Sequence, residues 1–319
     1  MKLIDMHCDT LGRFKWEPGA HLRENNFCID LKKMQKAGSL AQFFACFIYA
    51  KQFEGGDVWE QCYQAALSMI ASGKKEFADN ADVIALARNY DEIMANKAAG
   101  KMSAILTVEE GGVINGKMEY LEQLYRQGIR LITLTWNWEN CFGFPNSADA
   151  ELMKKGLKPF GIEAVQKMNE LGMIVDVSHL SDGGFWDVLE YSRKPVVASH
   201  SNARALCGHQ RNLTDEMIRA MAEKGGVAGV NFYPLFVHES QKITAENLAD
   251  HVEYMYRKGG EDFVAMGTDF DGFSNGESTI TNIGQMDEVY DAIKRRGFTD
   301  RQMEKIWSGN VLRVIKENL

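Results

Sequence analysis

Histidine and carboxylate side chains follow several short apolar segments of this 319-residue chain. The first segment, residues 3–7, runs directly into His7-Cys8-Asp9, so that two groups able to bind a metal ion lie two residues apart. Because side chains alternate between the two faces of a strand, we expect Asp5, His7 and Asp9 to face the same way. A pair of this kind can hold one ion from one side, and it gains meaning when similar groups close other strands.

Four more apolar segments end in residues of the same types. Their ends are Glu109-Glu110, Ser178-His179, Ser199-His200 and Thr268-Asp269. Three histidines and two carboxylates are too many ligands for one tetrahedral zinc ion, but they suit two ions that share a carboxylate. Two ions roughly 3.5–4 Å apart can hold a hydroxide between them and lower its pKa toward neutrality. The residues therefore indicate a binuclear hydrolytic centre.

The carboxylate that the two ions share is expected to be Glu110. A carboxylate can bridge two ions because it has two oxygens, and Gly111-Gly112 would let the chain turn tightly over them. By alternation, Glu109 is expected to face the other way and to form a surface group or an ion pair.

Eight apolar segments, separated by longer stretches of helical periodicity, must position these residues. Most are apolar on both faces, as in Val196-Val197-Ala198, which is typical of parallel strands covered by helices. A capping box, Thr299-x-x-Gln302, is expected to open a last helix that runs to Leu319. The expected strands are residues 3–7, 41–49, 104–109, 130–135, 173–179, 195–200, 226–232 and 263–269.

This alternation predicts an α/β fold, a (β/α)8 TIM barrel of the metal-dependent hydrolase type, with additional helices after the second strand. In such barrels the chemistry lies at the C-terminal ends of the strands. A doubly wound open sheet is the alternative, but residues 8–12 do not form the Gly-rich phosphate loop that it would need after its first strand. With five prolines and no Pro-rich linker, residues 1–319 are expected to form a single domain.

Composition limits the partners and the location. The net charge is −8, with no long Lys/Arg run, so a nucleic-acid partner is not expected. No apolar stretch approaches the ~18 residues of a membrane span, and the N-terminus enters a strand without a recognisable signal peptide. The six cysteines are scattered without a CxxC pair, which favours reduced thiols in a cytoplasmic protein.

As a set, these residues resemble the membrane (renal) dipeptidase family of zinc metallopeptidases and its bacterial cytoplasmic relatives. The resemblance spans the chain from end to end. Its segments are Asp5-Met6-His7-Cys8-Asp9, Glu110-Gly111-Gly112, Leu131-Ile132-Thr133-Leu134-Thr135, Asp176-Val177-Ser178-His179, Ser199-His200-Ser201-Asn202, Arg211-Asn212, Gly267-Thr268-Asp269-Phe270-Asp271-Gly272 and Gly309-Asn310-Val311-Leu312-Arg313-Val314.

The resemblance implies a dipeptidase with two zinc ions per chain and a free dipeptide as its substrate. His7 and Asp9 would bind one zinc, His179 and His200 would bind the other, and Glu110 would bridge them. Asp269 would be the acid/base group beside the bridging hydroxide. Arg211 would hold the substrate's carboxylate with its fork of donors. A homodimer is also implied.

One position departs from the family pattern. Renal members carry a His after the Leu-Thr-Leu-Thr stretch, where it contacts the scissile carbonyl, and this chain has Trp136. Indole donates one hydrogen bond but does not titrate. Either Trp136 or Asn137 therefore contacts the substrate, or polarisation by the metal suffices, which leaves the preferred side chains and their chirality open.

Two other functions remain compatible with the residues. The same hydroxide could attack an N-acyl amino acid or a cyclic amide, although many such amidohydrolases carry His-x-His where this chain has His7-x-Asp9. A metal-binding protein without activity could also retain the barrel. A panel of dipeptides, N-acyl amino acids and lactams, together with the metal content, separates these functions.

Overall fold

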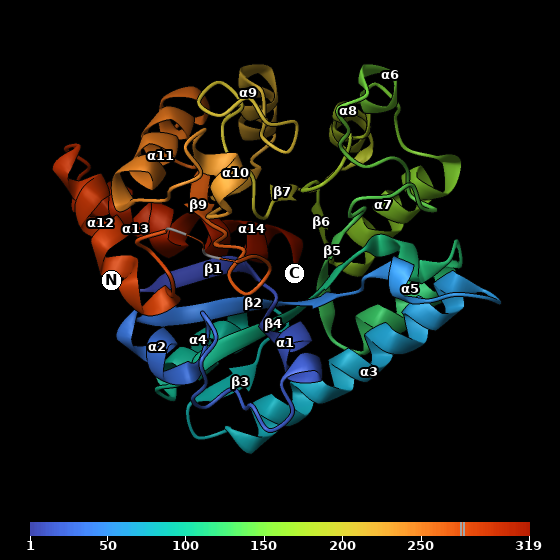
Figure 1. Ribbon diagram of the computed structural model, residues 1–319, viewed down its shortest axis with the longest axis horizontal. Coiled ribbons are helices and arrows are strands. Elements are labelled where there is room, and N and C mark those ends of the chain that lie inside the picture. Colours follow the sequence, from blue (N-terminus) through green and yellow to red (C-terminus); the bar gives the residue numbers. More distant parts are fainter. Residues whose placement is uncertain (275, 277) are drawn as a thin grey trace.

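The computed structural model describes residues 1–274, 276 and 278–319, and its strands form a closed parallel barrel surrounded by helices (Figure 1). Strand β1 pairs with both β2 and β9, and β2 pairs with β4, so the sheet closes on itself. The barrel strands are β1 (Leu3–Cys8), β2 (Ser39–Phe47), β4 (Met102–Glu109), β5 (Ile129–Thr133), β6 (Ile174–Asp176), β7 (Val197–Ala198), β8 (Val227–Val230) and β9 (Val264–Met266). All eight expected strands are present, and the predicted (β/α)8 barrel is confirmed.

A ninth strand, β3 (Ile84–Leu86), was not expected from the sequence. It pairs with Met102–Ala104 at the start of β4, whereas β5 pairs with the same strand farther along, at Leu106–Glu109. Strand β3 therefore extends the sheet beside the N-terminal end of β4 and takes no part in closing the barrel.

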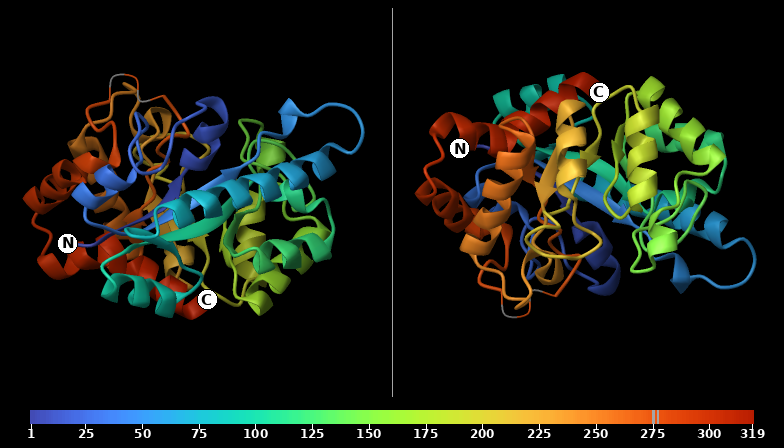
Figure 2. Two further views of the ribbon diagram at one scale, coloured as in Figure 1. Left: turned by 90° about the horizontal axis from the view of Figure 1, so that it is seen from below. Right: turned by 90° about the horizontal axis from the view of Figure 1, so that it is seen from above.

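Helices cover the outside of the barrel (Figures 1 and 2). The longest, α3, starts at an N-cap, Asp57, whose side chain accepts from Glu60 N. The α-helices are α1 (Thr10–Trp16), α2 (Leu31–Lys36), α3 (Val58–Asp79), α4 (Tyr90–Ala98), α5 (Met118–Arg126), α6 (Ala150–Met153), α7 (Pro159–Leu171), α8 (Asp182–Tyr191), α9 (Asp215–Glu223), α10 (Pro234–Val237), α11 (Ala245–Gly259), α12 (Met286–Arg295), α13 (Asp300–Glu304) and α14 (Asn310–Asn318).

The last helix is not continuous, contrary to expectation. The capping box of Thr299 and Gln302 forms and opens α13, but residues Lys305–Gly309 make a π-helical segment before α14 begins. Directly after it, the Asn310 side chain donates to Val264 O at 2.8 Å and to Glu261 O at 3.0 Å. The interruption thus coincides with the point where the helix is tied to the start of β9.

Strand alternation divides the core into two layers. On β4, Leu106 and Val108 belong to the layer between sheet and helices. Ile105 belongs to the inner layer, which also contains Val311 and Val314 of α14. Burial of each such side chain is worth roughly 1.5–3 kcal/mol. The inner face of β4 therefore carries Ile105, Thr107 and Glu109, and the last of these lies at the C-terminal mouth.

Candidate metal and substrate site

His7 and Asp9 meet at the end of β1, but Asp5 does not join them. His7 Nε2 lies 3.3 Å from Asp9 Oδ2. The β1 register is irregular between Asp5 and Cys8, so simple alternation from Asp5 to Asp9 is lost. The Asp5 carboxylate instead accepts from Thr268 N at 2.7 Å and from Gln42 Nε2 at 2.9 Å. The expectation for Asp5 was wrong, and its carboxylate ties β1 to β2 and β9.

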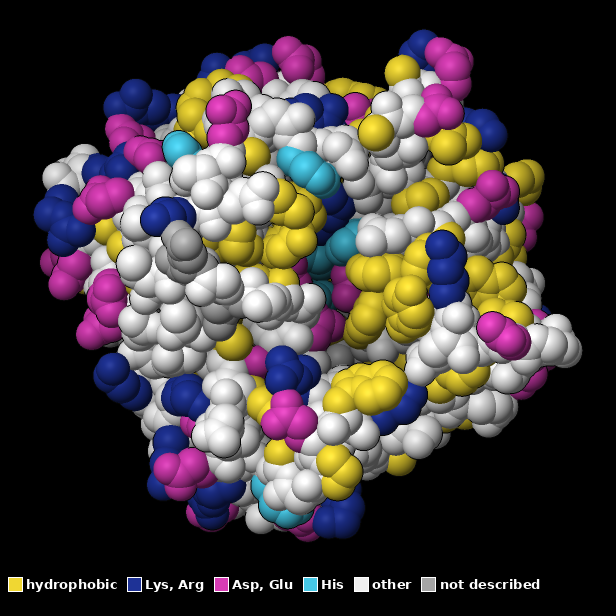
Figure 3. Space-filling view, in the orientation of Figure 1, with side chains coloured by type: hydrophobic (Ala, Val, Ile, Leu, Met, Phe, Trp, Pro, Cys, Tyr) yellow, Lys and Arg dark blue, Asp and Glu magenta, His cyan; other side chains and the backbone are white. Residues whose placement is uncertain are grey.

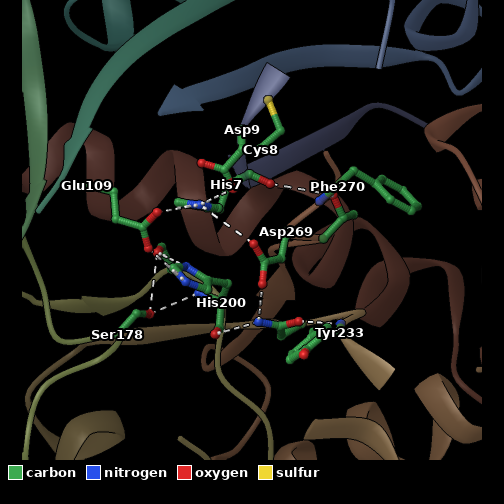
Figure 4. A network of polar contacts seen from close by, with 12 residues as sticks. His7, Cys8, Asp9, Glu109, Ser178, His200, Tyr233, Asp269 and Phe270 are labelled. Carbon is green, nitrogen blue, oxygen red and sulfur yellow. Dashed lines mark hydrogen bonds and ion pairs between the residues drawn. The ribbon is translucent and has the colours of Figure 1, made fainter. Parts of the chain in front are cut away.

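The Glu109 carboxylate points toward His7 and His200 (Figure 4). Its Oε1 is 3.0 Å from His179 Nε2 and 3.4 Å from His200 Nε2. Its Oε2 is 3.6 Å from His7 Nε2. Each oxygen of this buried carboxylate thus faces a different part of the cluster, which is the arrangement a bridging ligand needs.

Glu110 is not in this cluster, so its expected place facing the histidines was wrong. The residue has a φ of 85°, which turns the chain out of the strand direction after Glu109. Its Oε1 accepts from Gly112 N at 2.9 Å and from Asn140 Nδ2 at 2.6 Å. Asn140 Nδ2 also donates to Leu134 O. Glu110 therefore braces the loop after β5, whereas Glu109 takes the position expected of Glu110.

Asn137, expected to contact substrate, bonds to a histidine of the cluster. Its Oδ1 lies 3.1 Å from His179 Nδ1. An acceptor at Nδ1 holds the proton there and leaves the Nε2 lone pair free. His179 itself has a φ of 68°, and its carbonyl accepts from Asn146 N at 2.7 Å, which helps to hold this strained backbone.

His200 is oriented by a chain of hydrogen bonds from the barrel interior. Its Nδ1 lies 2.8 Å from Ser199 Oγ, and Ser199 Oγ donates to Asp176 Oδ2 at 2.5 Å. Thr133 Oγ1 donates to the same oxygen at 2.6 Å, and Ser178 N donates to Asp176 Oδ1 at 3.0 Å. With its hydroxyl proton given to Asp176, Ser199 can only accept from His200. This chain also fixes Nε2 as the free nitrogen.

Asp269 faces the same space from the loop after β9. Its Oδ1 is 3.9 Å from His7 Nε2, and its Oδ2 accepts from Asn231 Nδ2 at 2.9 Å. A Cβ on Gly272 would lie 2.4 Å from Asp9 Oδ2 and 2.7 Å from Asp269 Oδ1. Only glycine therefore allows both carboxylates their present positions.

Arg211 reaches the cavity as a buried cation, 6% exposed. Among the residues that the structure describes, it has no carboxylate within 4.0 Å, and Nε has no hydrogen-bond partner. Its terminal nitrogens donate to Ser201 Oγ at 3.3 Å and to His200 O at 3.2 Å. Burial lowers the pKa of Arg211 to about 10. A buried guanidinium that makes no direct ion pair with a described carboxylate is suited to an anionic ligand.

Burial and neighbouring charges shift the pKa values of the cluster. Burial would lower the pKa of His7, but the carboxylates of Glu109 and Asp9 outweigh it and raise that pKa well above its usual value. Burial lowers the pKa of His179 to about 4 and lowers the pKa of His200 as well, so both rings are neutral. Burial would raise the pKa of Glu109, but the neighbouring histidines outweigh it and hold the pKa well below its usual value. Burial raises the pKa of Asp269 to about 7, which suits a group that accepts and returns a proton near neutral pH.

A cavity of about 970 Å³ opens over this cluster. In Figure 3 it is a hollow with histidine and acidic side chains in its depth and apolar side chains along its rim. Trp136 and Asn137 both line it, as do Arg211 and Asp269. The structure thus brings together every expected site residue except Glu110.

The donor set fits metal ions. Three carboxylates and three imidazoles crowd one buried space, and two groups of three, His7-Glu109-His200 and His7-Asp9-Asp269, have ligand atoms within 4.8 Å of one another. Buried Asp9 Oδ1 lacks a hydrogen-bond partner among the described residues. Glu109 Oε1 faces Nε2 of His179 and of His200, and these nitrogens carry no proton to donate to it. Unpaired buried carboxylate oxygens are costly unless a cation binds them.

Sequence reasoning missed Glu109 and the positioning residues Ser199 and Asn231. A signal for Glu109 was present, because Ser103, Thr107 and Glu109 share one face of β4 while Leu106 and Val108 share the other. Polar residues at alternate positions of a buried strand indicate the face that reaches the site. Asn231 carried no such signal, since its bond to Asp269 joins two loops far apart in sequence.

Comparisons with known proteins place this site in a family. The model of the family described as membrane dipeptidase (peptidase family M19) matches residues 1–318. A Schizosaccharomyces pombe protein described as an uncharacterized dipeptidase is 33% identical over 341 residues, which cover 99% of this chain and 80% of the relative. The dipeptidase tcpJ of Claviceps purpurea is 28% identical over 294 residues, covering 91% of this chain and 69% of that protein.

Solved structures agree with the sequence comparison. The crystal structure of the dipeptidase AC, a metallopeptidase of family M19, superposes with a TM-score of 0.88 at 26% identity, covering 100% of this chain and 98% of that one. In the part of the chain that the structure describes, we find no helix with the length and hydrophobicity of a membrane span. Together, the matches over the whole chain show that it belongs to the membrane dipeptidase family, peptidase family M19, and is a metal-dependent dipeptidase.

Proposed function

We propose that this protein hydrolyses the peptide bond of free dipeptides with two zinc ions bridged by Glu109. The observation that carries this proposal is the orientation of the Glu109 carboxylate, with Oε2 toward His7 and Oε1 toward His179 and His200. His7 and Asp9 would hold one ion, and His179 and His200 the other. Mixed imidazole and carboxylate ligation favours zinc.

When bound, the pair of ions would polarise the scissile carbonyl and supply a hydroxide at neutral pH. The protein's own groups bind the substrate and move the protons. Arg211 pairs with the dipeptide's carboxylate, which places the peptide bond over the histidine cluster. Asp269 accepts a proton from the attacking water at Oδ1 and returns it to the departing amine, while Asn231 holds Oδ2.

The direct test combines metal content with a substrate panel. Protein loaded with zinc and then dialysed is expected to retain two ions per chain and to hydrolyse free dipeptides faster than N-acyl amino acids or lactams. A single retained ion would contradict the binuclear centre. Faster turnover of lactams or N-acyl amino acids would contradict the choice of substrate.

Arg211→Ala is expected to raise KM for free dipeptides by roughly 10–150-fold, the loss expected for a charge-assisted hydrogen bond worth about 1.5–3 kcal/mol. C-terminal dipeptide amides lack the carboxylate and should be affected much less. Steady-state kinetics on matched acids and amides measures the difference.

Arg204→Ala is the control for disruption of the loop that carries Arg211. The Arg204 fork is already paired with Asp182, at 2.8 and 2.7 Å, and Arg204 does not line the cavity. This variant should change the kinetics of acids and amides equally. An equal effect of Arg211→Ala on both substrates would rule out its role in carboxylate binding.

Ser199→Ala is expected to weaken zinc binding roughly 10–100-fold, because His200 loses the acceptor that holds its Nδ1 proton. Thr133→Val is the matched control, since it removes a bond to the same oxygen of Asp176 without touching His200. Zinc affinity measured against a competing chelator reports the effect without reference to activity. Equal affinities of the two variants would contradict the positioning role of Ser199.

The oligomeric state and the cellular location stay predictions. The homodimer follows from the family resemblance alone, and light scattering on the purified protein measures it directly. The cytoplasmic location follows from the scattered cysteines of the sequence, and fractionation of the source cells tests it.

A further inference from the structure

The cavity has aromatic walls on two sides. Phe47, the last residue of β2, and Trp136, in the loop after β5, line the cavity with their ring centroids 4.8 Å apart. We call them the Phe47–Trp136 wall. A second wall is formed by Tyr233 and Phe236, from the loop and helix α10 after β8, and by Phe273, from the loop after β9. The ring centroid of Tyr233 is 4.6 Å from that of Phe236 and 5.3 Å from that of Phe273. We call these three the Tyr233 wall.

Arg211 belongs to the side of the Tyr233 wall. Arg211 is in the loop that follows β7, and its guanidinium lies 5.3 Å from the Phe236 ring centroid. Strand β2 is four strands from β7 in either direction around the barrel, through β1, β9 and β8 or through β4, β5 and β6. Phe47, the last residue of β2, therefore faces the Arg211 loop from the opposite side of the mouth.

This arrangement orients a dipeptide, given the proposed function on which the inference rests. With its carboxylate on Arg211 and its scissile carbonyl over the histidine cluster, the substrate has its C-terminal residue beside the Tyr233 wall. Its N-terminal residue then extends toward the opposite side. The Trp136 ring centroid is 6.1 Å from that of His179, so the Phe47–Trp136 wall begins directly beside the cluster.

The Phe47–Trp136 wall is braced from behind. Trp138 contacts the Trp136 ring edge-on at 4.9 Å, and Tyr49 does so at 5.8 Å. Lys51 Nζ in turn lies 4.4 Å from the Trp138 ring centroid. A braced aromatic surface makes extensive contacts with apolar side chains and prefers edge or offset contacts with other rings.

We infer that the Phe47–Trp136 wall is the specificity determinant for the N-terminal residue, and that it selects dipeptides with a large apolar or aromatic side chain at that position. Each additional apolar group that fits such a pocket changes kcat/KM by roughly 10–200-fold. Glycine at the N-terminal position leaves the wall without a contact and should be a poor substrate.

The experiment compares kcat/KM ratios in the zinc-loaded enzyme, because a ratio cancels general damage to the site. The substrates are Phe-Ala, Leu-Ala and Gly-Ala, with L- or D-alanine at the C-terminal position, and Ala-Phe and Ala-Gly as the reverse pair. The wild type should favour Phe-Ala over Gly-Ala by at least about 10-fold. Trp136→Ala should reduce that ratio by about 10-fold and leave the ratio of Ala-Phe to Ala-Gly unchanged.

Phe273→Ala is the matched control from the Tyr233 wall, and it should change the ratio of Ala-Phe to Ala-Gly while sparing the ratio of Phe-Ala to Gly-Ala. Phe47→Leu, which keeps an apolar side chain, tests the same wall if Trp136→Ala does not fold. The inference is overturned if Trp136→Ala changes the ratio of Phe-Ala to Gly-Ala and the ratio of Ala-Phe to Ala-Gly equally, or if it changes neither ratio. Failure of the wild type to cleave any dipeptide overturns the proposed function, whereas cleavage without N-terminal preference overturns the assignment of the wall alone.

Discussion

Glu109→Gln will abolish nearly all dipeptidase activity and reduce the bound metal below two ions per chain. The amide offers one oxygen and no negative charge, so it cannot bridge two cations as the carboxylate can. The lost stabilisation of transition-state charge is worth several kcal/mol of barrier, at 1.36 kcal/mol for each tenfold change in rate. Metal analysis of the dialysed variant and turnover of a free dipeptide measure both effects.

Glu110→Gln is the control, one residue away in the same chain. The amide oxygen can still accept from Gly112 N and Asn140 Nδ2, both of which donate to Glu110 Oε1. Its amino group replaces Oε2, which has no partner among the described residues, so a stability loss of about 1–3 kcal/mol is expected with both ions retained. Loss of metal in Glu110→Gln with full binding in Glu109→Gln would reverse the assignment.

Asp269→Asn is expected to lower kcat by roughly 10²–10⁴-fold while both metal ions stay bound, because the amide cannot take up the water's proton. The substitution preserves size, and the amide oxygen can still accept from Asn231 Nδ2. The acid limb of the pH–rate profile should disappear with the carboxylate. Burial gives Asp269 a pKa of about 7, and bound cations would lower it, so the wild-type limb should lie below pH 7.

Asp271→Asn separates the proton-transfer role from local stability. Asp271 accepts from Thr10 Oγ1 and from Cys28 N, both at 2.7 Å, and it therefore holds α1 and the segment before α2. This variant should lower the unfolding temperature more than it lowers kcat. A kcat loss in Asp271→Asn as large as that in Asp269→Asn would show that loop integrity, and not proton transfer, explains the latter.

Glu109 and Glu110 are adjacent in the chain, but only Glu109 contacts the histidines of the site. Glu109 ends the strand with its side chain inside the barrel, whereas Glu110 adopts a φ of 85° and turns to the loop after β5. That loop carries Trp136 and Asn137. A substitution of Glu110 should therefore disturb the Phe47–Trp136 wall and the His179 ring more than it disturbs the bridging carboxylate of Glu109.

The sequence by itself determined the eight barrel strands and the places where histidines close them. Apolar segments of five to nine residues, separated by helical periodicity, leave few alternatives to a parallel barrel, and parallel strands bring their C-terminal ends to one mouth. Hence His7, Asp9, His179, His200 and Asp269 could be assigned to one site before their contacts were known, whereas Arg211 was assigned to it from the family resemblance. The missed strand β3 has three residues, too short for a clear pattern.

Only the tertiary structure decided which carboxylate joins the histidines and what each wall of the cavity contacts. The choice between Glu109 and Glu110 depends on which face of β4 turns inward. The polar face of Ser103, Thr107 and Glu109 was a hint, and closure of the barrel settled it. The bond of Asn137 to His179, the chain from Asp176 through Ser199 to His200, and the place of Phe47 opposite Arg211 all join distant segments. Such contacts follow from the closed order of the strands, which spacing along the chain does not encode.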